Sequence, residues 1–174
     1  MLPVDVASAE RIRLGTDEVT VRATSAQTGG TLLAVDIRMP PGGGPPVMHR
    51  HEPGEVYYVR SGEFTFYIGE GSGVRRLTAV VGDVVPLAGG TPHTIRNESV
   101  ADAVAFVVHA PGAPMENFSR AAAALAAGGP PSMDAVLTIA ARNGIEMLGP
   151  IPEMPDDRVR SAATDSGSGV VAGP

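Results

Sequence analysis

The chain has 174 residues, a length that fits one domain, and 43% of them are hydrophobic, which is enough to build a core. The net charge of −6 and the absence of a basic stretch argue against nucleic-acid binding. There is no cysteine, which excludes disulfides and thiolate metal sites, so any metal ion must have nitrogen and oxygen ligands. We find neither a signal peptide nor an apolar run near the ~20 residues that span a bilayer. We therefore expect a cytoplasmic protein that does not bind membranes.

Alternation of apolar and polar residues predicts strands over most of the chain. Residues 31–39 are the clearest case, because Leu33, Val35 and Ile37 fall on one face. The proline- and glycine-rich residues 40–47 are expected to form a loop. Further strands are predicted over residues 18–23, 55–60, 63–69, 74–80, 83–87, 92–97 and 102–109. Many short strands separated by glycine turns are typical of an all-β barrel or sandwich.

The pattern changes after Pro111. Residues 115–129 are alanine-rich and end in a glycine pair, which predicts a helix. Residues 132–144 predict a second helix, with Ser132 as its N-cap. The predicted organisation is a β-barrel domain over residues 1–112, a helical appendage packed on the barrel over 113–150, and a disordered tail over 151–174.

Two of the four histidines, His49 and His51, stand two residues apart. On a strand such residues point to the same face, so both could bind one metal ion. Glu55 has the same parity and follows a short turn, and His93 is the candidate for a ligand from another strand. Three imidazoles and one carboxylate suit one divalent ion of Fe, Ni, Mn, Co, Cu or Zn. Four ligands on an octahedral ion leave two positions for substrate, water or O₂.

Two segments resemble the motifs of the cupin superfamily. Residues 43–62, GGPPVMHRHEPGEVYYVRSG, resemble the first motif through Gly43, His49, His51, Glu55 and Gly62. Residues 82–97, GDVVPLAGGTPHTIRN, resemble the second through Gly82, Gly90, His93 and Asn97, although Ala88 replaces the proline of the family. The resemblance covers residues 18–112 and is to single-domain (monocupin) metalloproteins of the quercetin dioxygenase-like kind. It implies a cupin double-stranded β-barrel (jelly roll) with two short C-terminal helices, the metal ligands His49, His51, Glu55 and His93, and a homodimer.

Other residues are candidates for the wall of a substrate pocket, although each could instead belong to the core. Tyr57 could hydrogen-bond to substrate or to Glu55, or pack in the core with its hydroxyl satisfied. His109 could relay protons, or it could be an ordinary residue at the end of a strand. The candidate pocket residues are Met39, Val47, Tyr57, Phe64, Phe66, Ile95 and His109.

Open positions on a redox-capable metal suit O₂ chemistry, and the resemblance implies the same. The leading hypothesis is a dioxygenase of a small aromatic, flavonoid-like or polyketide-like substrate, with Glu55 as a ligand or as a catalytic base. The same centre could act as a Lewis acid alone, in an isomerase, cyclase, lyase or decarboxylase. A third hypothesis is a small-molecule-binding protein without catalysis.

Overall fold

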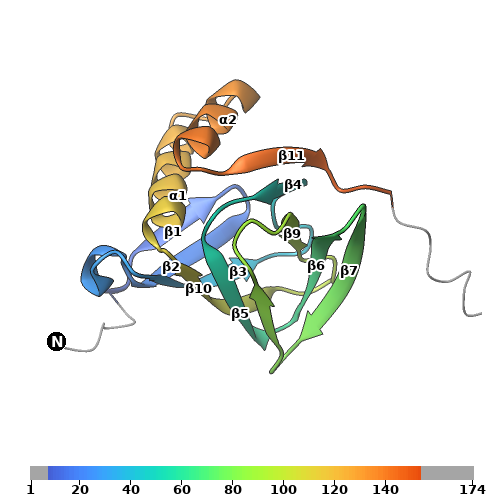
Figure 1. The fold of residues 1–174 in the computed structure, drawn as a ribbon. Coiled ribbons are helices and arrows are strands. Elements are labelled where there is room, and N and C mark those ends of the chain that lie inside the picture. Colours follow the sequence, from blue (N-terminus) through green and yellow to red (C-terminus); the bar gives the residue numbers. More distant parts are fainter. Residues whose placement is uncertain (1–7, 154–174) are drawn as a thin grey trace, which may run out of the picture.

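The computed structural model describes residues 8–153 (Figure 1), so most of the predicted tail lies outside the described residues. The strands are β1 (Arg11–Leu14), β2 (Asp17–Ala23), β3 (Leu33–Met39), β4 (Val47–Arg50), β5 (Gly54–Ser61), β6 (Glu63–Glu70), β7 (Gly73–Val80), β8 (Val84–Leu87), β9 (His93–Arg96), β10 (Ala103–Ala110) and β11 (Glu146–Pro150). The helices are the 3-10 turn η2 (Ala26–Thr28), α1 (Ala113–Ala126) and α2 (Met133–Arg142).

The strands form two antiparallel sheets that pack face to face. One sheet has the order β1-β2-β3-β10-β5-β8 and the other the order β11-β4-β9-β6-β7. The core lies between them, and its largest fully buried side chains include Phe64 and Phe66 from β6 and Val59 from β5. The predicted jelly roll with two C-terminal helices is confirmed, in the form of two packed sheets rather than a closed barrel (Figure 1).

Side chains along the central strands β5 and β10 point alternately into the core and outward. In β10, Ala103, Ala105, Val107 and His109 are buried, while the residues between them are partly exposed. In β5, Glu55, Tyr57 and Val59 are buried in the same way. The inner face of these two strands is therefore apolar along most of its length and polar at one end, where Glu55 and His109 are register partners.

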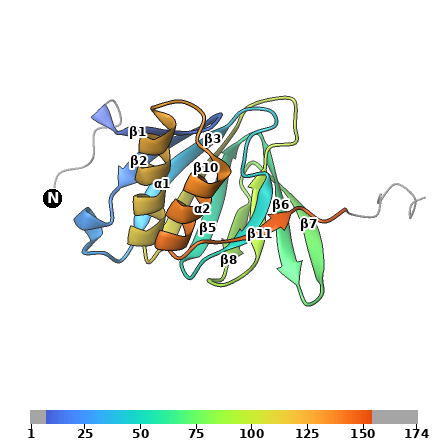
Figure 2. The same ribbon diagram turned by 90° about the horizontal axis from the view of Figure 1, so that it is seen from above.

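Helix α1 packs next to β1, α2 lies beside α1, and the chain then returns to the sheet (Figures 1 and 2). Helix α2 begins after Ser132, whose side chain accepts a hydrogen bond from the amide of Ala135, as expected of an N-cap. Strand β11, which was not predicted, pairs with β4 and brings Glu146 within 2.7 Å of Arg50. No helix in residues 8–153 is long and apolar enough to cross a membrane.

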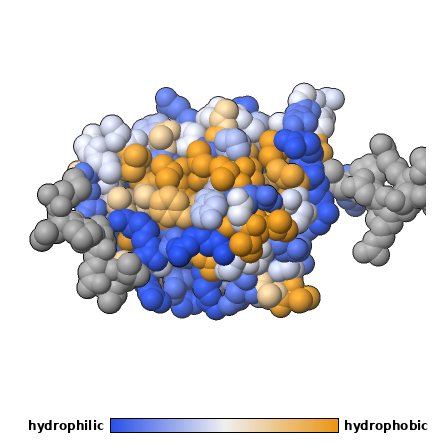
Figure 3. Space-filling model, turned by 90° about the horizontal axis from the view of Figure 1, so that it is seen from below, coloured by the Kyte–Doolittle hydropathy of each residue, from blue (hydrophilic) through white to orange (hydrophobic). Residues whose placement is uncertain are grey.

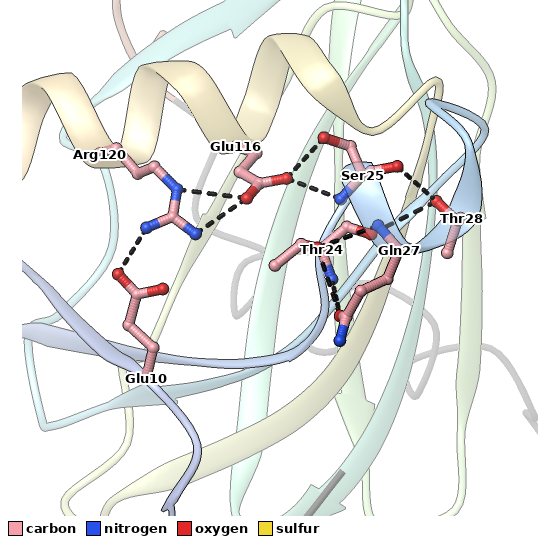
Figure 4. Close-up of polar contacts among 7 residues, drawn as sticks. All are labelled: Glu10, Thr24, Ser25, Gln27, Thr28, Glu116 and Arg120. Atoms are coloured by element: carbon pink, nitrogen blue, oxygen red, sulfur yellow. Dashed lines mark hydrogen bonds and ion pairs between the residues drawn. The ribbon is translucent and has the colours of Figure 1, made fainter. Parts of the chain in front are cut away.

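Helix α1 is fixed to the β-domain by Glu116, a buried residue of its first turn (Figure 4). The Glu116 carboxylate accepts hydrogen bonds from the amide and the hydroxyl of Ser25, at 2.7 and 2.6 Å. Arg120, one turn further on, donates to the same carboxylate and also pairs with Glu10. These contacts join the start of the helix to the loop between β2 and β3.

Candidate metal centre

Three buried imidazoles converge between the two sheets. His49 on β4 and His93 on β9 are register partners, and His51 follows directly after β4. Their ring centroids lie 4.6 to 5.7 Å apart. One nitrogen from each ring lies within 4.8 Å of the others, which is close enough for a single ion to bind all three. The structure thus brings together the three histidines that the sequence predicted as ligands.

Backbone carbonyls orient these rings. Nδ1 of His51 lies 2.9 Å from the carbonyl of Pro53, and Nδ1 of His93 lies 2.8 Å from that of Thr91. Nδ1 of His49 faces the carbonyl of Val47 at 3.5 Å, a longer contact. A carbonyl is an acceptor, so this geometry assigns a proton to Nδ1 of His51 and His93, and in the neutral ring Nε2 is then available to bind a metal ion. Such outer hydrogen bonds are typical of metal-binding histidines.

Glu55 reaches the imidazoles from the opposite sheet. Its carboxylate lies 3.2 Å from Nε2 of His51 and 3.4 Å from Nε2 of His93. Its other neighbours are the Tyr57 hydroxyl, which donates a hydrogen bond of 2.7 Å, and Nδ1 of His109 at 2.9 Å. Glu55 is not part of the tightest group, which consists of the three histidines. Its place as the fourth ligand therefore remains a prediction.

The electrostatics of the site favour a neutral His49 imidazole and an ionised Glu55 carboxylate. Burial lowers the pKa of His49 to about 4, and the neighbouring His93 adds to this effect. Burial alone would also lower the pKa of His93, but the Glu55 carboxylate raises it overall. Burial would raise the pKa of Glu55, yet His109 and the two nearest imidazoles hold it well below its usual value. The site thus places the negative charge of Glu55 near the neutral imidazole of His49.

The donors present fit a divalent transition metal. Nε2 of His51 is buried and completes no well-directed hydrogen bond with a described residue, which suits a nitrogen that binds a metal ion. Imidazoles with one nearby carboxylate match Fe, Ni, Mn, Co, Cu or Zn, and the set does not select among them.

The candidate pocket residues divide into two groups. Met39, Tyr57, Phe64, Phe66 and Ile95 belong to the hydrophobic core, whereas Val47 is half-buried and His109 is buried beside Glu55. Two surface hollows, of about 420 and 590 Å³, are lined by other residues and lie away from the histidines. A role of these candidates in substrate binding therefore stays a prediction.

Sequence reasoning missed the supporting contacts. The carbonyls of Pro53 and Thr91 orient His51 and His93, and each stands two residues from its histidine. That spacing was visible in the sequence, but only the turn geometry shows that the carbonyls face the rings. Strand β11 gave no clear signal either, although Met147 is the register partner of His49.

Comparison with known proteins is consistent with this geometry. Residues 35–109 match the family model of the Cupin domain, and this segment contains all four histidines and Glu55. A search of curated proteins found no match to the chain.

Several solved structures share the fold. A predicted oxalate decarboxylase from Thermotoga maritima is 23% identical, with 63% of this chain and 98% of that chain covered and a TM-score of 0.54. The polyketide cyclase RemF from Streptomyces resistomycificus is 16% identical, with coverage of 64% and 80% and a TM-score of 0.53. A sugar phosphate isomerase from Silicibacter pomeroyi is 20% identical, with coverage of 62% and 74% and a TM-score of 0.51. The matched segment and these structures together show that the chain has a cupin fold.

Proposed function

We propose that the chain is a cytoplasmic, metal-dependent cupin enzyme of the quercetin dioxygenase-like kind. Its substrate is a small aromatic, flavonoid-like or polyketide-like molecule, and its second substrate is O₂. The observation that carries the proposal is the group of three buried imidazoles whose nitrogens lie within 4.8 Å of one another, with the Glu55 carboxylate beside them. Three neutral donors and one carboxylate leave room on an octahedral ion for two further ligands.

The residues of the centre have separate tasks. His49, His51 and His93 would hold the ion, and their Nδ1–H groups stay on backbone carbonyls. A bound divalent ion would supply activation of O₂ and of a substrate oxygen. Glu55 would either complete the ligand set or accept the proton of a substrate hydroxyl. The apolar side chains around the centre, Phe66 and Ile95 among them, would exclude water.

A non-oxidative reaction is the second candidate. The three similar structures are named as a decarboxylase, a cyclase and an isomerase, so the fold is compatible with these classes. With Zn²⁺ the same residues would serve a Lewis acid, and Glu55 would again be the candidate base.

Elemental analysis of the purified protein, combined with oxygen-electrode measurements on a panel of flavonols and related phenols, tests the proposal. We expect about one Fe, Ni, Mn, Co or Cu ion per chain and oxygen uptake that depends on substrate. Zinc without oxygen uptake would favour the non-oxidative enzyme. If the protein binds no metal even after reconstitution, both metalloenzyme hypotheses fail and the remaining one is a small-molecule-binding protein without catalysis.

We also propose that the protein is a homodimer, formed through the outer face of the six-stranded sheet. Val56, Tyr58 and Val84 on this face are 43%, 45% and 59% exposed, and Tyr58 is the register partner of both Val84 and Phe106. Apolar residues gather on the face seen from below, with hydrophilic residues around them (Figure 3). The apolar part of this face lies beside a charged hollow that Arg22, Asp36 and Arg60 help to line. An apolar patch of this kind suits a second, identical sheet packed against it.

A further inference from the structure

Two residues outside the group of three imidazoles, Tyr57 and His109, also contact the Glu55 carboxylate. Oε2 accepts a hydrogen bond of 2.7 Å from the Tyr57 hydroxyl, and Oε1 lies 2.9 Å from Nδ1 of His109. On the other side, Oε1 faces His51 at 3.2 Å and Oε2 faces His93 at 3.4 Å. Each carboxylate oxygen therefore lies between one imidazole of the centre and one residue of the surrounding wall.

Both wall residues belong to the same sheet as Glu55. Tyr57 lies two residues further along β5 and points to the same face, and its ring packs edge-on against Phe66 with centroids 5.2 Å apart. His109 is the register partner of Glu55 on the neighbouring strand β10. Because strand pairing and ring packing fix Tyr57 and His109, neither can follow the carboxylate if it moves.

Burial makes movement of the carboxylate unfavourable. Glu55, Tyr57 and His109 are each only 4% exposed, so water has little access to replace a lost partner. Nδ1 of His109 completes no well-directed hydrogen bond with any described residue, and the Glu55 carboxylate, at 2.9 Å, is its charge partner. A swing of Glu55 toward substrate would leave the Tyr57 hydroxyl without its acceptor and would take the charge partner away from His109.

We propose that Tyr57 and His109 are positioning residues that hold Glu55 as a fixed fourth ligand of the metal ion, rather than as a mobile base. This role rests on the proposed metal centre, but it does not depend on whether the reaction consumes oxygen. Of the two roles that the sequence left open for Glu55, metal ligand or catalytic base, this proposal selects the ligand.

The test measures Co²⁺ binding to the whole protein, because the visible absorption of Co²⁺ reports on the number and kind of its ligands. In Tyr57→Phe and in His109→Leu, the dissociation constant of Co²⁺ should rise about 10- to 100-fold, the usual effect of losing an outer partner, and the absorption should change. His109→Asn keeps a donor near the place of Nδ1 and should restore most of the affinity. Tyr67→Phe is the matched control, because the Tyr67 hydroxyl bonds Glu98 outside the centre.

A second measurement separates positioning from a general loss of structure. In the Glu55→Gln background, Tyr57→Phe should add little to the loss of Co²⁺ affinity, because its effect passes through the carboxylate. Thermal unfolding of the metal-free variants identifies any that fail to fold. Affinity and absorption unchanged in both Tyr57→Phe and His109→Leu would overturn the proposal, as would full additivity with Glu55→Gln. If the wild-type protein binds Co²⁺ but consumes no oxygen, the proposed oxygenase activity is refuted and the positioning role of Tyr57 and His109 is not.

Discussion

At the scale of single residues, His93 is the candidate ligand that the second motif contributes to the histidine group. It comes from β9, whereas His49 and His51 come from β4 and the turn after it. We predict that His93→Ala weakens metal binding by about 100-fold or more, beyond what loss of an outer partner costs. Metal content after dialysis, measured beside Arg50→Ala, provides the check, because Arg50 lies on the same strand as His49 but is exposed. Full metal occupancy in His93→Ala would remove it from the ligand set.

Asn97 is a buried residue whose importance is structural. Its amide nitrogen donates to the carbonyls of Met39 and Ala101, at 2.8 and 2.7 Å, and its oxygen accepts from Ser99. These hydrogen bonds tie the turn after β9 to the end of β3.

We predict that Asn97→Ala lowers the free energy of unfolding by about 2–3 kcal/mol, because buried carbonyls lose their partners. Urea denaturation measures the change. Asn143→Ala, which removes a single hydrogen bond at the end of α2, should cost about 1 kcal/mol or less. Equal losses in the two variants would contradict this account.

The sequence predicted the group of three histidines but not the residues that contact it, and the reason is physical. Alternation along a strand tells which residues share a face, so His49 and His51 could be grouped from their spacing alone. It does not give the register between strands, and the contact of His109 with Glu55 depends on that register. The sequence therefore left the role of His109 open.

At the scale of elements, the attachment of α1 should depend on pH. Burial would raise the pKa of Glu116, but its hydrogen bonds to Ser25 and the Arg120 guanidinium lower it below its usual 4.5. A carboxylate with a lowered pKa stabilises the fold above its unfolded-state pKa, and this contribution is lost as the pH falls through its folded-state pKa.

We therefore predict that Glu116→Gln lowers the free energy of unfolding by about 1–2 kcal/mol at pH 7, with a difference that shrinks in acid below pH 4.5. Denaturation curves at several pH values measure it. Glu70→Gln removes only an exposed ion pair with Arg75 and should have little effect at any pH. If Glu116→Gln lowers the free energy of unfolding by the same amount at pH 7 and in acid, the ionised Glu116 carboxylate is not the source of the stability.

Strand β11 links the helical segment to the metal centre, because it pairs with the strand that carries His49. We predict that Met147→Pro, which disrupts this pairing, weakens metal binding several-fold and lowers the melting temperature. Metal titration and thermal unfolding are the measurements, with Glu153→Pro beyond the strand as the control. Unchanged metal affinity in Met147→Pro would show that the centre does not need β11.

Short elements were the ones that sequence patterns failed to predict. Strand β11 has only five residues and contains Gly149 and Pro150, which normally signal a turn. Its pairing with β4 is a long-range event that local patterns do not encode. Longer strands such as β3 and β10 were predicted nearly to their ends, because seven or eight residues show alternation clearly.

At the scale of the whole molecule, the proposed dimer can be disrupted without touching the metal centre. We predict that Val84→Glu weakens dimerisation about tenfold or more, because it places a charge within an apolar contact. Met133→Glu is the matched control, since Met133 is 66% exposed on α2, away from this sheet face. Analytical ultracentrifugation reports the change, and a monomeric wild-type protein would refute the proposed interface.

The two sides of the candidate metal centre belong to different sheets, which bears on folding. His49 and His93 come from the five-stranded sheet, whereas Glu55 comes from the six-stranded sheet. An ion held by all of them would act as a cross-link between the layers, in a chain that has no cysteine to form one by oxidation. The tighter the ion binds to the native state alone, the more it opposes separation of the sheets. Metal supply would then govern how long the protein survives as well as what it catalyses.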